Sequence, residues 1–84
     1  MPYSLKIKNS AAKEIRRLSL HDRSRVVAAI DSLREQPLVG TVLKGQFTGL
    51  RRIRVGNFRV IYEVQEAVLV VLVLRVGHRR DIYR

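Results

Sequence analysis

The chain has 84 residues, 46% of them hydrophobic, which is enough for one packed domain over residues 1–84 and argues against intrinsic disorder. It has no cysteine, only two histidines, and no apolar run of the kind found in membrane spans or secretion signals, so we expect a cytoplasmic protein without disulfides, metal or cofactor. The 17 lysines and arginines outnumber the 7 aspartates and glutamates and give a net charge of +10, which favours a polyanionic partner over a merely solvated basic surface.

The first third of the chain predicts a strand followed by a short helix. Residues Tyr3 to Lys8 alternate apolar and polar side chains, which is the period of a half-buried strand. Asn9-Ser10 then supplies side chains typical of a helix N-cap, and an apolar stripe at helical spacing continues to Leu18.

A second helix is predicted between Asp22, its expected N-cap, and Pro37. Pro37 should end it, because the residue before a proline is pushed out of the helical region. The apolar stripe of this helix consists of Val26, Val27, Ile30 and Leu33. We expect the two helices to form a hairpin over one face of a sheet, with part of this stripe exposed for a protein partner.

Three strands are predicted in the C-terminal half. After a connector from Leu38 to Gly49, the first strand spans Leu50–Val55, and Gly56-Asn57 forms a two-residue turn into the second strand, Phe58–Val64. The third strand, Val68–Val76, is apolar on both faces and is therefore expected in the interior of the sheet. The order predicts an α+β fold of type β-α-α-β-β-β, with an antiparallel-rich sheet and the helix hairpin on one face.

The tight turn fixes which side chains share a face of the sheet. Arg54 should lie directly opposite Arg59, with Arg52 two residues along on the same face. The other face should belong to the core, and it carries Ile53, Val55, Phe58, Val60 and Tyr62. Like charges placed opposite one another destabilise a sheet, so the arginine cluster favours an anion-binding site. The alternative is a solvated face with Glu63 as a local counter-charge.

The end of the third strand should come close to the same arginines. If this strand pairs antiparallel to the second, its last residues lie near the Gly56-Asn57 turn. The basic and aromatic residues that would then surround the patch are Arg75, His78, Arg79, Arg80, Tyr83 and Arg84. Tyr83 can stack on a base or share a proton, or it can belong to a frayed chain end. His78 can titrate near neutrality, but we favour a structural or RNA-contacting role for it.

Two sequence blocks together resemble the RelE branch of the RelE/ParE toxin superfamily. They read LRRIRVGNFRVIYEV over residues 50–64 and VLRVGHRRDIYR over residues 73–84, and the resemblance covers essentially the whole chain. It implies a fold similar to small microbial ribonucleases and a toxin that enters the ribosomal A site and cuts mRNA there without a metal. It also implies a cognate antitoxin, which we expect to be acidic because the toxin surface is positive.

The resemblance also assigns roles to individual residues. It puts the family's strand cations at Arg52 and Arg54, its phosphate-binding arginine at Arg59, its tail arginine at Arg79 and its C-terminal tyrosine at Tyr83. On this interpretation Arg59, Arg79, Tyr83 and Arg54 are catalytic. The RNA-binding set is Arg52, Arg54, Arg75, His78, Arg80 and Arg84. Some relatives have lysines where this chain has Arg52 and Arg54, and arginine stays protonated, so the general base is left open.

Two other functions remain open at this point. A ParE-like relative with the same fold would poison DNA gyrase instead of cutting RNA. A non-catalytic module that binds RNA or DNA would use the same charge. The combination of Arg52, Arg54, Arg59 and Arg79 favours the ribonuclease over both.

Overall fold

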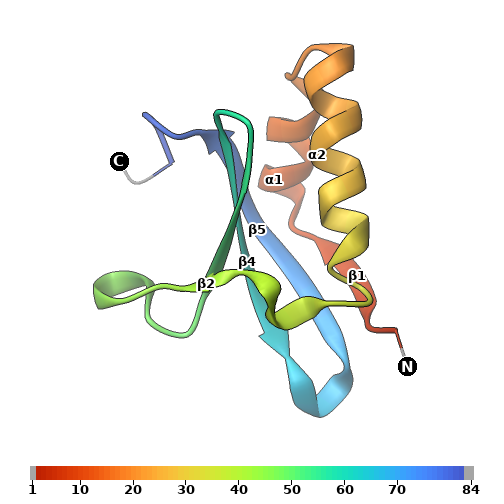
Figure 1. Ribbon diagram of the computed structural model, residues 1–84, viewed down its shortest axis with the longest axis vertical. Helices are drawn as coiled ribbons and strands as arrows, with labels where there is room; N and C mark the ends of the chain where they lie inside the picture. The colour runs from red at the N-terminus through yellow and green to blue at the C-terminus, as the bar shows by residue number, and fades with distance from the viewer. Residues whose placement is uncertain (1, 83–84) are drawn as a thin grey trace.

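The computed structural model describes residues 2–82 and has two helices on one side of a twisted five-stranded sheet (Figure 1). The elements are β1 (Ser4–Ile7), α1 (Asn9–Arg16), α2 (Leu20–Ser32), β2 (Thr41–Val42), β3 (Arg51–Val55), β4 (Phe58–Gln65) and β5 (Val70–His78). The strand order is β1-β5-β4-β3-β2, with β1 parallel to β5 and every other pair antiparallel. The predicted α+β fold is confirmed. The strand β2 was not predicted, because it lies inside the segment expected to be a connector.

The predicted helix caps were wrong, although both helices are present. Lys8 donates its backbone N–H to the carbonyl of Val73 at 2.9 Å and is the N-cap of α1, so Asn9 and Ser10 already lie in the first turn. The N-cap of α2 is Ser19, whose Oγ accepts the backbone N–H of Asp22 at 3.2 Å. The carboxylate of Asp22 therefore sits in the first turn, where the helix dipole favours a negative charge.

The helix α2 ends earlier than predicted. Its last residue is Ser32, and Pro37 instead begins a short 3-10 turn over Pro37–Val39, at a position that needs no backbone N–H. Val26, Ile30 and Leu33 are all buried against the sheet. Val27 of the same stripe remains 48% exposed, so the expectation that part of the stripe stays exposed is confirmed at this residue. Neither helix in residues 2–82 combines the length and apolarity needed to cross a membrane.

The core lies between the helices and the inner face of the sheet, which is the face turned toward them. The predicted core residues of β3 and β4 are confirmed: Val55, Val60 and Tyr62 are buried, and Ile53 and Phe58 pack against them. Burial raises the pKa of the Tyr62 phenol. Its hydroxyl donates to the carbonyl of Pro37 at 2.7 Å and accepts the backbone N–H of Gly40 at 3.0 Å. A side chain at Gly40 would collide with that hydroxyl, so the close approach requires glycine.

The β3–β4 hairpin has the predicted pairs, Val55 with Phe58, Arg54 with Arg59 and Ile53 with Val60. The strand β5 lies between β1 and β4, as its two apolar faces predicted. It begins at Val70, later than expected, because a 3-10 turn over Glu66–Val68 and a left-handed Leu69 (φ 55°) form the loop before it. Its pairing with β4 shifts by one residue between Ile61 and Tyr62.

Candidate nucleic-acid interface

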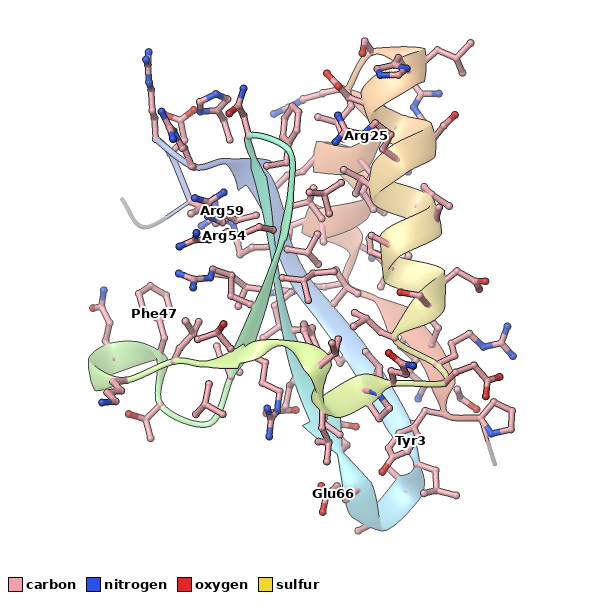
Figure 2. The ribbon with its side chains drawn as sticks, viewed as in Figure 1. Tyr3, Arg25, Phe47, Arg54, Arg59 and Glu66 are labelled. Atoms are coloured by element: carbon pink, nitrogen blue, oxygen red, sulfur yellow. The ribbon has the colours of Figure 1, made fainter. Side chains whose placement is uncertain are left out.

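Two rows of side chains cross the outer face of the sheet, which is the face turned away from the helices. The first row consists of Arg54, Arg59 and Gly77 on β3, β4 and β5. The second row consists of Thr41, Arg52, Ile61 and Arg75 on β2 to β5. Figure 2 shows Arg54 and Arg59 extending from the sheet on the side opposite the helices. The strand positions therefore gather three guanidinium groups, those of Arg52, Arg54 and Arg59, on one face.

The arginines of this face differ in exposure. Arg54 is exposed and forms no ion pair with any residue in the described range 2–82, whereas Arg52 and Arg59 are half-buried. Arg59 donates from Nη1 to the carbonyl of Phe58 at 3.4 Å. Glu63, the alternative counter-charge, accepts a hydrogen bond from Nε2 of Gln65 at 2.7 Å and likewise forms no ion pair with a described residue. Like charges at neighbouring positions of one sheet face are unfavourable, and a polyanion bound at this face would stabilise the arrangement.

The floor of the outer face is apolar, which the sequence did not indicate. Ile61 and Ile82 are 0% and 1% exposed although neither belongs to the core beneath the helices. A Cβ on Gly77 would lie 3.4 Å from Cδ1 of Ile82, so the tail folds back over this glycine. Rigid packing below the arginines limits how far their backbone positions can move.

The tail, which consists of residues 79–82, turns back at the end of β5 and is hydrogen-bonded to the β3–β4 hairpin. The backbone N–H of Arg79 donates to the carbonyl of Asn57 at 2.9 Å, and the N–H groups of Asp81 and Ile82 donate to the carbonyl of His78. Arg79 is thus held at the β3–β4 turn, next to the first row. Arg79 and Arg80 are both exposed. Tyr83 and Arg84, which complete the predicted site, lie outside the described residues.

His78 and Arg75 do not join the open arginine surface. His78 pairs across β4 with Phe58, and their rings make an edge contact at 5.9 Å between centroids. Because Phe58 packs against the core, the His78 ring lies on the inner side of the sheet. Its Nδ1 accepts the backbone N–H of Arg80 at 3.2 Å. Arg75 begins on the outer face, but its Nη2 pairs with Oε2 of Glu14 in α1 at 3.3 Å.

Two further features border the arginines. A hollow of about 430 Å³ lies where β2 and β3 diverge, and it is lined by Val39, Gly40, Thr41, Arg52, Ile53 and Arg54. Phe47, in a 3-10 turn over Gly45–Phe47, lies on the same side of the sheet as Arg54 and Arg59 (Figure 2). An aromatic ring beside guanidinium groups can stack on a base while the cations bind the phosphates. Sequence reasoning missed Phe47, because it lies in a loop without alternation.

The side chains of the two rows can stabilise negative charge. The two rows contain no histidine and no carboxylate. Within residues 2–82, no three histidine, cysteine, aspartate or glutamate side chains gather as a metal site requires. Fixed guanidinium donors can bind two oxygens of a phosphate and stabilise negative charge that develops there.

Comparisons with known proteins identify similar sequences over the whole chain. A family model described as the ParE toxin of the type II toxin–antitoxin system parDE matches residues 5–83. The chain is 34% identical over 86 residues to Toxin RelG of Mycobacterium tuberculosis, covering 100% of this chain and 99% of RelG.

Solved structures of similar proteins share the fold. The toxin–antitoxin complex RelBE2 of Mycobacterium tuberculosis matches with a TM-score of 0.86 and 30% identity over 94% of this chain and 100% of the other. The archaeal RelE–RelB complex of Pyrococcus horikoshii OT3 gives 0.79 and 30% over 96% and 99%. The isolated RelE toxin of E. coli gives 0.79 and 26% over 90% and 83%.

Proposed function

The chain belongs to the RelE/ParE family of toxins of type II toxin–antitoxin systems, and we propose that it is a ribosome-dependent endoribonuclease that cuts mRNA in the A site of the 70S ribosome. The observation that carries the proposal is the cross-strand pair Arg54 and Arg59 with Arg52 beside it on the outer face. An array of cations fixed on a sheet suits a bent RNA strand whose scissile phosphate gains charge. Inhibition of translation would follow from the loss of mRNA.

The proposed reaction is an internal transfer at phosphorus. The ribose 2′-oxygen attacks the adjacent phosphate, the bond to the 5′-oxygen breaks, and the products are a 2′,3′-cyclic phosphate and a 5′-hydroxyl. The 2′-hydroxyl loses its proton and the leaving oxygen gains one, so no redox partner, metal or cofactor enters the balance. Proton transfer is the step that the arginines do not explain, because arginine stays protonated. We assign it to Tyr83 together with groups of the ribosome.

Each arginine has a separate role in this proposal. Arg59 binds the non-bridging phosphate oxygens, where the transition state gathers negative charge. Arg79 offsets the charge on the leaving oxygen, and Arg52 and Arg54 hold the RNA backbone. Tyr83 stacks on a base or exchanges a proton. Arg80 and Arg84 add contacts to phosphates along the strand.

The decisive experiment is primer extension on mRNA bound to ribosomes, with and without the protein. Arg59→Ala should lower the cleavage rate by about 10²–10³-fold, which is the usual effect of removing one donor to a developing oxyanion. Ribosome binding should change only modestly, because the other cations remain. Arg34→Ala, which removes an exposed arginine in the turn after α2, is the matched control and should cleave normally. A wild-type protein that binds ribosomes and leaves the mRNA intact at every concentration would reduce the function to nucleic-acid binding.

A second candidate is the poisoning of DNA gyrase, which the ParE description of the matching family model favours. Expression of the protein in cells distinguishes the two functions. DNA damage with continuing translation indicates gyrase as the target, whereas translation arrest with intact DNA supports the ribonuclease.

We also propose that an acidic antitoxin binds this toxin, since similar proteins were solved as the toxin–antitoxin complex RelBE2 and as an archaeal RelE–RelB complex. A hollow of about 530 Å³ between α2 and β1 leaves Ile7 38% and Val27 48% exposed, beside Arg23. An amphipathic acidic segment would cover these apolar side chains and neutralise part of the net charge of +10. Growth arrest on expression alone, relieved by an acidic protein encoded next to it, is the expected result.

A further inference from the structure

The edge of β5 is closed by a side chain of α1. The strand β1 pairs with Val70–Val73, and within residues 2–82 no strand lies beside the rest of β5 on that side. Oε1 of Glu14 accepts the backbone N–H of Val76 at 2.9 Å, taking the place of a strand carbonyl. An unpaired edge N–H is an unfavourable site for a protein, and a fixed carboxylate satisfies it.

The same carboxylate holds Arg75. Oε2 of Glu14 accepts from both Nε and Nη2 of Arg75 at 3.3 Å. The Glu14 and Arg75 side chains are 24% and 41% exposed, compared with 68% and 46% for Asp31 and Arg34, an ion pair at the end of α2. The pair at β5 is therefore better shielded from water than the pair at the end of α2, and both oxygens of the Glu14 carboxylate are used.

Arg75 in turn reaches the tail. Its Nη1 donates to the carbonyl of Ile82 at 3.4 Å, while the Ile82 side chain is buried over Gly77. Ile82 also closes the turn that starts at His78, since its N–H donates to the His78 carbonyl at 3.2 Å. Arg79 lies inside this turn. The chain of contacts from Glu14 through Arg75 to Ile82 thus fixes both ends of the segment that presents Arg79.

We infer that Glu14 and Arg75 are positioning residues that hold the turn over residues 78–82, and with it Arg79, against the outer face of the sheet. The inference rests on the proposed function, because Arg79 is assigned there to the leaving oxygen. It replaces the sequence-based interpretation of Arg75 as an RNA ligand. Three of the five N–H donors of this guanidinium are engaged within the protein, and the carboxylate of Glu14 already neutralises its charge.

Glutamine variants distinguish a positioning role from RNA binding. Glu14→Gln keeps an oxygen for the Val76 N–H but removes the charge that holds Arg75, and Arg75→Gln removes the bridge itself. We expect each variant to lower the kcat of mRNA cleavage on ribosomes about tenfold with KM nearly unchanged, because small displacements of a reacting group have effects of this order. The double variant should be no slower than either single variant, since both break one connection. Arg75→Lys, which keeps the charge without the planar fork, should recover part of the rate.

An RNA ligand at position 75 gives the opposite pattern. Arg75→Gln would then raise KM, and Glu14→Gln, which frees the guanidinium, would lower it. That pattern, or fully additive losses of kcat in the double variant, would overturn the inference. Arg34→Gln is the matched control, because it removes the arginine of the ion pair with Asp31, away from the tail, and it should match wild type in kcat and KM.

Amide hydrogen exchange on the purified chain tests the same connection without any RNA. The N–H groups of Arg79, Asp81 and Ile82 should exchange faster in Glu14→Gln and Arg75→Gln than in wild type and Arg34→Gln, while the N–H of Val60 in the central strand stays protected. Unchanged exchange at residues 79–82 would contradict the positioning role even if wild type cleaves mRNA. Faster exchange in a protein that never cleaves mRNA would support the structural connection and reject the proposed function instead.

Discussion

The two faces of the β3–β4 hairpin are built from one short sequence and have opposite properties. The inner face places Val60 and Tyr62 in the core, fully buried beneath the helices. The outer face places Arg54 and Arg59 opposite each other, in a pairing that costs stability in the absence of an anion. Period-two alternation lets the same backbone stabilise the fold on one side and present charge on the other. Substitutions on the two faces should therefore separate stability from function.

The largest effect on stability is expected from the core between the helices and the inner face. Ile30 of α2 is 1% exposed, so Ile30→Ala removes a packed side chain and should lower the free energy of unfolding by about 2–5 kcal/mol. Arg54→Ala on the outer face should change it by no more than about 0.5 kcal/mol, because Arg54 is exposed and loses only repulsion. Urea unfolding of the two variants measures both values. A large loss in Arg54→Ala would mean that the outer arginines are part of the structural framework.

Sequence reasoning succeeded where short-range geometry decides the outcome. The two-residue turn at Gly56-Asn57 set the pairing of every residue in the hairpin, so the arginine cluster and the core side of β4 followed directly. The apolar stripes of the two helices also followed from residue spacing alone. The N-cap of α2 was misplaced because Ser19 and Asp22 are both good caps, and the end of α1 decides between them.

The missed features depend on contacts between distant parts of the chain. Glu14 and Arg75 are 61 positions apart, and no local pattern links them. His78 was expected beside the outer arginines, but the one-residue shift in the β4–β5 pairing between Ile61 and Tyr62 sets it opposite Phe58 and on the inner side. The two-residue strand β2 has no alternation to detect, and it exists because it pairs with Arg51 and Arg52 of β3.

Tyr62 connects the inner face to the segment that carries β2, and its removal should have an intermediate effect. Tyr62→Phe leaves the Gly40 N–H and the Pro37 carbonyl without their buried partner, which should cost about 1–3 kcal/mol. The raised pKa of Tyr62 also predicts a loss of stability in alkali, because the unfolded chain releases this proton near pH 10.0 while the folded protein retains it. The stability from the neutral phenol is thus complete below pH 10.0 and falls as the pH rises above it. Urea unfolding against pH should show this additional alkaline loss in wild type and lack it in Tyr62→Phe.

The smallest expected effect is a change in the salt dependence of RNA binding by the outer face. If Arg54 binds one phosphate, Arg54→Gln should reduce the slope of the logarithm of the RNA-binding constant against the logarithm of salt concentration. The expected reduction is about 0.7, which is the value for one phosphate contact to a single strand. The reduction should be the same for RNAs of different sequence. Arg34→Gln, on the helical side of the molecule and away from the outer face, should leave the slope unchanged. Fluorescence anisotropy with a short single-stranded RNA at several salt concentrations measures both slopes. Equal reductions in the two variants would indicate that the net charge attracts RNA without a preferred face, and the outer face would then have no special role in binding.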